Sequence, residues 1–373
     1  MTDFFIVIFI SVIAWGTSFI FNKLYPQEIS HHEKYGTIDG LRGYLAILVF
    51  IHHSAMWFFY LHTKVWTVPK SIILSNIGGL GVTLFFMITA FLFSEKIKQN
   101  NMNWRKLYLK RIFRLSPLFL FSLSIMLIIV LIKSNLKLNT SLTDLVINIL
   151  KWIPFSFGGR PDINNLTDTR VINAGVTWSL VYEWFFYFSL PTLYFLFKNK
   201  VMNAYVIFSA FCVIIFFVYP ATEMKIHLFS FFFGALSSYL IDNKILISFA
   251  RSKSASLLVM LLLSASLFTS ANYYNYTSIG LSGVSFIFIC CGCNLLGLLE
   301  NKTSKILGSC TYSIYLLHGI VLFVILRMCI PINFNMSEAE HWITIFLITP
   351  IVISISLITY NLIEKPFMRI KIQ

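Results

Sequence analysis

The 373-residue sequence is poor in charge, with Asp, Glu, Lys and Arg making up 12% of it, where ordinary soluble domains have about a quarter. Hydrophobic residues make up 57%. This composition excludes a soluble globular protein and predicts an all-α bundle of membrane-spanning helices. Although the net charge is +14, the basic residues are scattered among long apolar runs and form no continuous basic face. The sequence therefore also excludes a protein that binds nucleic acid.

Cysteine is scarce, and the six that occur lie in apolar stretches or at their edges. Cys290, Cys291 and Cys293 are close together, but no His or carboxylate lies near them at ligand spacing. We therefore expect them to pack as small hydrophobic side chains, and we expect no metal site. No internal repeat, low-complexity linker or soluble domain interrupts the chain, so we expect one integral-membrane domain over residues 1–373.

The sequence contains eleven stretches of the length that a membrane-spanning helix needs, about 20 mostly apolar residues. They cover residues 4–22, 42–61, 76–94, 115–133, 176–197, 202–219, 226–241, 255–271, 279–298, 309–330 and 342–363. The first stretch has no basic segment before it and no small-residue cleavage site after it. We interpret it as a retained helix rather than a signal peptide.

The basic residues predict the orientation of these spans. When successive loops alternate between the two sides, 20 of the 29 Lys and Arg residues fall on one side. The positive-inside rule then places the carboxyl terminus in the cytoplasm, and an odd number of spans places the amino terminus outside. The cytoplasmic segment 94–114 carries seven basic residues and predicts a surface for anions. The outward segment 134–175 is rich in Asn, Asp, Thr, Gly and Pro, which predicts a binding loop or lid.

Ionisable residues inside spans are costly in a bilayer, which makes them candidates for function. Arg42 and His53 are eleven residues apart, about three turns of helix, so both project from one face. His53 is about 16 Å deeper than Arg42, at 1.5 Å per residue. This spacing predicts Arg42 at the cytoplasmic mouth and His53 near the middle of the membrane, where it is either a general base or a structural hydrogen-bonding group.

Glu183 is a second ionisable residue inside a span, about 10 Å below the outer boundary. In a hydrocarbon core of about 30 Å it could therefore meet His53. A carboxylate in this place would select the imidazole tautomer and stabilise the imidazolium. The structural alternative is that Glu183 only braces an Arg or a Tyr. His318 is another histidine inside a span, and we expect it to hydrogen-bond within the bundle.

Arg111 and Arg114 lie three residues apart at the start of the fourth span. Both can face one ligand on a helix, and guanidinium groups suit phosphate. A solvated basic flank of the membrane would have a similar sequence. Together with His53 and Arg42, the pair favours catalysis on a phosphate-bearing donor that enters from the cytoplasm.

At these positions the sequence resembles the membrane-bound acyltransferase-3 family. The blocks that carry the resemblance are Asp39–Gly43 followed by His53, Gly78–Phe93, Arg111 with Arg114, Trp178–Tyr187, Gly308–His318 and Glu364–Phe367. They occur in order over residues 37–368, preceded by the additional helix 4–22. Thr89 and Ala90 depart from the family's usual Ser and Gly, within a segment for helix packing.

The resemblance implies an acyl donor, usually acetyl-CoA, that enters from the cytoplasm of a bacterium through its inner membrane. The implied acceptor is a hydroxyl of a cell-envelope glycan or lipid-linked oligosaccharide, of the lipopolysaccharide O-antigen or capsule type. His53 would be the catalytic histidine, either as a general base or as a transient acyl carrier, with Glu183 as its partner. Arg42, Arg111 and Arg114 would hold the CoA phosphates. Further candidate site residues in the matching blocks are Asp39, Trp178, Ser179, Tyr187, Tyr315 and His318. Some members append a soluble esterase-like domain, which we do not expect here.

Two other functions remain possible from the residues alone. One is a glycan flippase or transporter, in which buried His and Arg form a proton or anion path. The other is a polysaccharide polymerase with a large outward loop. The cytoplasmic arginine pair favours the acyltransferase, because a polymerase that works on the outer face has little use for it.

Overall fold

The computed structural model describes residues 2–27, 35–98, 102–198, 224–330 and 336–371. These ranges are built from helices and contain no β-strand, which confirms the all-α class. The long elements are α1 (Thr2–Leu24), α2 (Gly36–Thr63), α3 (Ile72–Lys98), α4 (Trp104–Lys133), α6 (Trp178–Lys198), α8 (Met224–Leu240) and α14 (Glu338–Thr359). The shorter ones are α5 (Leu142–Trp152), η1 (Thr169–Asn173), α9 (Lys244–Ala250), α10 (Lys253–Ser266), α11 (Tyr276–Cys290), α12 (Lys302–Ser309), α13 (Thr311–Phe323), η2 (Val324–Cys329), η3 (Tyr360–Glu364) and α15 (Lys365–Met368).

Many of these helices begin where an Asn or Ser side chain accepts a hydrogen bond from the backbone of the first turn, as helix caps do. The capping residues are Asn103, Ser141, Asn243, Ser252, Asn275, Asn301 and Ser337. Such caps are needed because a helix leaves its first backbone N–H groups unpaired. The apolar stretches therefore set where helices form, and the polar residues between them set where helices begin.

Among the described residues, six helices are long and apolar enough to cross a membrane, and the bent pair α9 and α10 would make a seventh span. Expected spans also correspond to α6, α8 and α11, which are shorter or less apolar over their described residues. The expected span 202–219 lies outside the described residues. The multi-pass membrane bundle is thus confirmed, with fewer full-length spans than eleven in the part of the chain that the structure describes.

Two expected spans end earlier than their apolar sequence predicts. The span expected over 255–271 ends at Ser266 in α10, and the one over 279–298 ends at Cys290 in α11. Gly292 and Gly297 have φ angles of 104° and 90°, a conformation that cannot continue a right-handed helix. The chain turns there while its composition stays apolar, so hydropathy contains no signal for the break.

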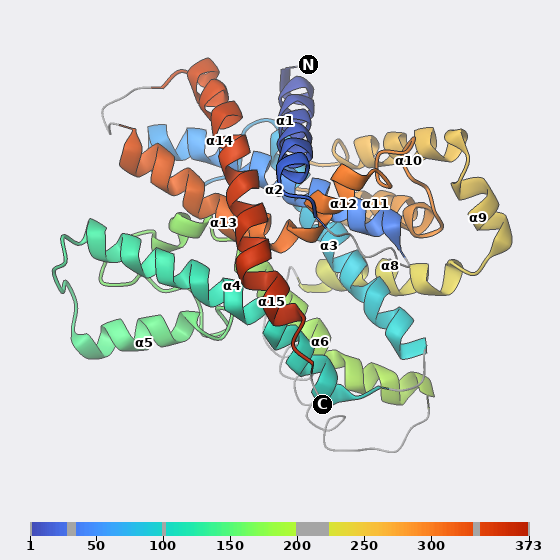
Figure 1. The fold of residues 1–373 in the computed structure, drawn as a ribbon, viewed down its shortest axis with the longest axis horizontal. Coiled ribbons are helices and arrows are strands. Elements are labelled where there is room, and N and C mark those ends of the chain that lie inside the picture. Colours follow the sequence, from blue (N-terminus) through green and yellow to red (C-terminus); the bar gives the residue numbers. More distant parts are fainter. Residues whose placement is uncertain (1, 28–34, 99–101, 199–223, 331–335, 372–373) are drawn as a thin grey trace.

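Segment 134–175, expected to be an outward loop, contains more regular structure than a loop. It includes the helix α5 and the short η1, and α5 exposes Leu142, Val146 and Leu150, which follow one another at one-turn spacing. An exposed apolar face opposite a polar one is typical of helices that lie along a membrane surface. In Figure 1, α5 lies beside α4, away from the centre of the bundle.

The centre of the bundle is formed by α2 and α3. α2 packs against α3, α12 and α13, and α3 packs against α8. Of the apolar window of α3, 78% is buried, against 17% for α1, which packs on α14 at the periphery. Figure 1 shows α1 beside the upper part of α14, with α15 at the opposite end of the molecule. The candidate residues of α2 therefore lie in the best-packed part of the chain.

Glycine allows α2 to approach α12 closely. A Cβ atom on Gly40 would collide with the carbonyl oxygen of Leu299, and one on Gly308 would collide with the carbonyl oxygen of Asp39. Small residues let helix backbones touch in this way in membrane proteins. The contact holds the turn of α2 that carries Arg42.

Gly40→Ala should therefore destabilise the bundle by about 1–3 kcal/mol, the usual cost of overpacking. The measurement is the melting temperature of the detergent-purified protein. Gly16→Ala on α1 is the matched control, because a Cβ there has no atom within 4 Å. Equal melting temperatures for the two variants would contradict the close α2–α12 contact.

Candidate active site

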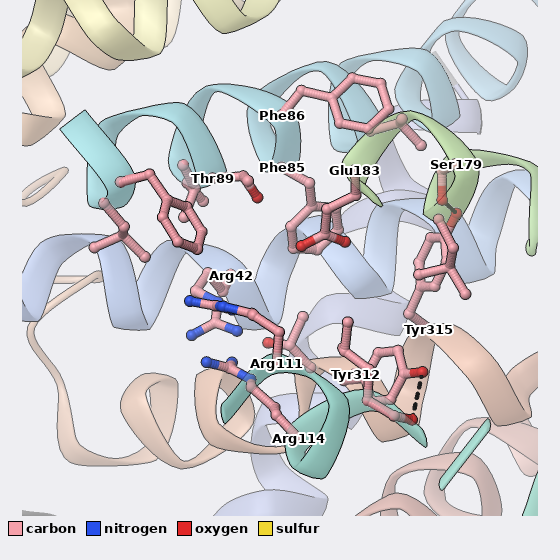
Figure 2. A pocket seen from close by; sticks show the side chains of 17 residues that line it. Arg42, Phe85, Phe86, Thr89, Arg111, Arg114, Ser179, Glu183, Tyr312 and Tyr315 are labelled. Carbon is pink, nitrogen blue, oxygen red and sulfur yellow. Dashed lines mark hydrogen bonds between the residues drawn. The ribbon is translucent and has the colours of Figure 1, made fainter. Parts of the chain in front are cut away.

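Three arginines from two helices line one cavity of about 100 Å³ inside the bundle. Arg42 comes from α2, and Arg111 and Arg114 come from α4, one turn apart. Figure 2 shows the three guanidinium groups on one side of the cavity and the carboxylate of Glu183 pointing into it from α6. The structure thus brings together four residues that the sequence singled out from three separate blocks.

The positive charge of this cavity is partly offset. Arg42 Nη1 lies 3.9 Å from Asp39 Oδ1, and Glu183 accepts a hydrogen bond from the Tyr187 hydroxyl. The Arg111 guanidinium lies over the Tyr187 ring at 5.3 Å from its centroid. Among the described residues that line the cavity, three carry guanidinium groups and one, Glu183, carries a carboxylate, so the lining keeps a net positive charge. Such a site favours a ligand with anionic oxygens.

A wider cavity of about 490 Å³ lies next to this one and shares Arg111 and Arg114 with it. Its other polar lining includes Lys96, Lys106 and Lys110. The shared arginines make the two cavities neighbours, with basic side chains in both. An anionic molecule in the wider cavity would therefore have the arginine cavity in reach.

His53 is paired with His318. Their rings are joined by a hydrogen bond of 3.0 Å between His53 Nδ1 and His318 Nε2, and both side chains are buried. His318 Nδ1 lies 2.9 Å from the carbonyl oxygen of Ile314. A carbonyl only accepts, so Nδ1 of His318 carries the proton and its Nε2 is the acceptor in the neutral form. His53 then donates from Nδ1, which leaves its Nε2 as a free base.

The expected pair of His53 and Glu183 does not form. Glu183 accepts from Tyr187 and faces the arginines, whereas the described hydrogen bond of the His53 ring goes to His318. The structural alternative for Glu183, bracing a Tyr, is what the structure shows. The depths of the two residues along their helices were compatible, but depth says nothing about the direction in which each side chain points.

Ser179 and Tyr315 form the end of the arginine cavity that is nearest to the histidines. Their hydroxyl groups lie 2.6 Å apart, and the Tyr315 hydroxyl donates to the carbonyl oxygen of Val176 at 3.0 Å. The Tyr315 ring contacts that of His318, with centroids 6.4 Å apart. Trp178, the neighbour of Ser179, lines a different cavity on the other side of this turn.

This other cavity, of about 270 Å³, contains His53. Trp66 stacks on the His53 ring at 6.2 Å between centroids, with 13° between the planes. Its further polar lining includes His52, Arg160, Arg170, Trp178 and Tyr274. The sequence did not single out Trp66, Arg160, Arg170 or Tyr274, although the polar composition of segment 134–175 predicted a binding loop there.

The sequence model of the acyltransferase-3 family, described as an acyltransferase domain, matches residues 35–361. The chain belongs to the acyltransferase-3 family. This acyltransferase is therefore a multi-pass membrane enzyme that transfers an acyl group from a donor to an acceptor. No curated protein and no solved structure shows significant similarity to it.

The family match covers every candidate residue that lines the cavities of the acyltransferase. It leaves out the whole of α1, which packs on α14 and lines none of these three cavities. Among the described residues, no group of three or more His, Cys, Asp or Glu side chains is placed to hold a metal ion. The arrangement instead offers a basic site for an anion and, beyond Tyr315, a free imidazole nitrogen.

Glu183→Gln removes the carboxylate that lines the cavity together with three guanidinium groups. We expect the variant to be less stable by about 1–3 kcal/mol, because the neutral amide still accepts from Tyr187 but no longer offsets the charge of the arginines. Inorganic pyrophosphate should raise its melting temperature more than that of the wild type, because a bound anion replaces the lost charge. Glu338→Gln, at an exposed site on α14, is the control. If pyrophosphate raised the melting temperatures of wild type and Glu183→Gln equally, Glu183 would not offset the charge of the arginines.

Proposed function

We propose that this acyltransferase moves an acetyl group from cytoplasmic acetyl-CoA to a hydroxyl of a cell-envelope glycan, of the lipopolysaccharide O-antigen or capsule type. The observation that carries the proposal is the position of His53. It lines one cavity and is linked through His318 and Tyr315 to a second cavity that is lined by arginines. A donor and an acceptor that enter from opposite sides would meet at this histidine.

The basic cavities suit the donor. CoA carries a pyrophosphate and a ribose phosphate at one end, and a thin apolar-polar pantetheine arm ends in the thioester. Lys96, Lys106 and Lys110 in the wider cavity would take the nucleotide phosphates, with Arg111 and Arg114 next to them. The pantetheine arm would then occupy the narrow cavity between Arg42 and Tyr315.

The histidine pair suits general base catalysis. His53 Nε2 accepts the proton of the acceptor hydroxyl while the hydroxyl oxygen attacks the thioester carbonyl carbon. The carbon–sulfur bond breaks, and the CoA thiolate leaves and takes the proton back from the imidazolium. His318 holds the imidazolium through the Nδ1–H bond, so it is a positioning residue. We propose direct transfer of this kind rather than a covalent acyl-histidine.

The orientation follows from the same assignment. The donor side, with Lys96, Lys106 and Lys110, would face the bacterial cytoplasm, and the cavity with His53 would open toward the outer face of the inner membrane. This places the amino terminus outside and the carboxyl terminus inside. We also propose that residues 1–373 act as one integral-membrane domain, to which α1 adds a peripheral helix.

The central test is transfer of acetyl groups by purified protein in nanodiscs, supplied with acetyl-CoA and with envelope glycan from a strain that lacks the gene. His53→Ala should lower kcat by about 10²–10⁴-fold, the usual contribution of general base catalysis. His318→Gln should lower kcat while the KM for acetyl-CoA stays unchanged. His62→Gln, at an exposed position on the same helix as His53, is the control.

Each rival function predicts a different outcome of this test. Full acetylation by His53→Ala at normal protein level would contradict the proposed mechanism. Solute flux that does not depend on CoA would instead indicate a transporter, and altered glycan chain length without altered acetyl content would indicate a polymerase. An acetylated enzyme that accumulates without acceptor would contradict direct transfer.

The donor assignment is tested with Lys110→Ala. An exposed charge pair is worth ~0.2–1 kcal/mol, so the KM for acetyl-CoA should rise by up to about fivefold. The KM for acetyl-dephospho-CoA should rise less if Lys110 binds the ribose phosphate. Lys137→Ala, an exposed lysine of the outward segment, is the control. Equal KM values for Lys110→Ala and wild type would remove this lysine from the donor site.

A further inference from the structure

Two arginines lie in the same cavity as His53. Arg160 and Arg170 both come from the outward segment 134–175, and both line the cavity of about 270 Å³ together with His53 and Trp66. A molecule whose hydroxyl reaches His53 would therefore have both guanidinium groups in reach. The mechanism described above uses neither of them.

The charge of these arginines is not offset by a carboxylate. In the described part of the chain, no Asp or Glu lies within ion-pair distance of Arg160 or Arg170, and none lines this cavity. Burial and the neighbouring charge of Arg170 lower the pKa of Arg160. The arginine cavity on the donor side differs in this respect, because Glu183 and Asp39 offset part of its charge.

The side chain of Arg160 and the backbone of Arg170 are held in place near the histidines. Arg160 Nη1 donates to the carbonyl oxygen of Gly175 at 2.9 Å, and the amide of Gly175 donates to the carbonyl oxygen of Arg170 at 2.8 Å. This part of the chain packs on α13, where a Cβ on Gly319 would collide with the backbone of Asn173. Gly319 directly follows His318. The backbone at Arg170 and the histidine pair therefore share one rigid contact.

Arg160 has donors left for a ligand. A guanidinium has five N–H donors, and the bond to Gly175 is the one that Arg160 makes among the described residues. Trp66 and Trp178 add aromatic surface to the same cavity, against which the apolar face of a sugar ring packs. Aromatic surface, guanidinium donors and a free base together match a sugar that carries an anionic group close to the reacting hydroxyl.

We propose that the acceptor is an acidic glycan, and that Arg160 and Arg170 bind a carboxylate or phosphate on or next to the sugar that receives the acyl group. This inference rests on the proposed acetyl transfer and adds the substrate class to it. Guanidinium groups pair with carboxylate and phosphate in the same bidentate manner. The two arginines would orient the acceptor so that one hydroxyl faces His53.

The test uses the full-length protein in nanodiscs, acetyl-CoA, and unacetylated envelope glycan from a strain that lacks the gene. One portion of glycan is left unmodified, one has its carboxylates amidated with a carbodiimide, and one has its phosphates removed. With wild type, one of the two neutralised glycans should lose about tenfold or more in kcat/KM, the loss of a hydrogen bond to a charged group. The neutralised glycan whose kcat/KM falls shows whether the arginines bind a carboxylate or a phosphate.

Arg170→Gln is the central variant, because this side chain is exposed and is not needed to close the loop. It should lose about tenfold in kcat/KM with unmodified glycan, keep the wild-type KM for acetyl-CoA, and no longer respond to neutralisation. Arg170→Lys should recover part of the activity. Arg160→Gln should behave like Arg170→Gln if it folds. Arg105→Gln, an exposed arginine that lines none of these cavities, is the control.

The outcomes separate the two proposals. Wild type that acetylates both neutralised glycans as well as the unmodified one would overturn the acidic acceptor and leave the acetyl transfer intact. A wild-type value of kcat/KM for Arg170→Gln would likewise overturn the acidic acceptor and leave the acetyl transfer intact. Wild type that transfers no acetyl group to unmodified glycan would instead overturn the proposed function, and the inference with it.

Discussion

Charge inside an apolar helical bundle is the constraint that shapes this acyltransferase. Arg42, Arg111 and Arg114 repel one another, and lipid offers them no hydration. The structure offsets this repulsion with Glu183, with Asp39 and with aromatic rings below Arg111. The offset is incomplete, because three guanidinium groups but one carboxylate, that of Glu183, are found among the described residues that line the cavity. The remaining positive charge disfavours the empty cavity and favours an anionic ligand, so the same feature that costs stability provides the binding site.

The histidine pair depends on a second constraint, which is that each buried ring nitrogen needs a hydrogen-bond partner of the right kind. His318 has one nitrogen directed at a backbone carbonyl, which can only accept, and this selects the protonation of the whole pair. The backbone carbonyl of Ile314 therefore determines which nitrogen of His53 is free to react, although the side chain of Ile314 takes no part in the reaction. The pair needs no carboxylate partner for its hydrogen bonds, because the carbonyl oxygen of Ile314 accepts from His318 and the two rings bond to each other.

Several features of the fold and the site could be predicted from sequence. Low charge and long apolar runs indicated a helical membrane bundle. The spacing of Arg42 and His53 on one helix predicted one face for both, whereas the two residues line different cavities. The predicted pairing of His53 with Glu183 was wrong. Counting residues along two helices gives the depth of each side chain in the membrane, but not the direction in which the side chain points. The predicted ends of the spans that correspond to α10 and α11 were also wrong. After α11 the chain turns at Gly292 without any loss of apolar character.

The sequence by itself determined the class of the fold, the family and the residue types available for chemistry, because these depend on composition and on local spacing. Only the tertiary structure decided which of those residues meet. His318 lies 265 positions from His53, and Arg160 reaches the same cavity from a loop. Such meetings depend on how α2, α6 and α13 rotate and pack, and on close contacts such as the one at Gly319. Packing of this kind is a property of all the helices together, so it has no signature in any single segment.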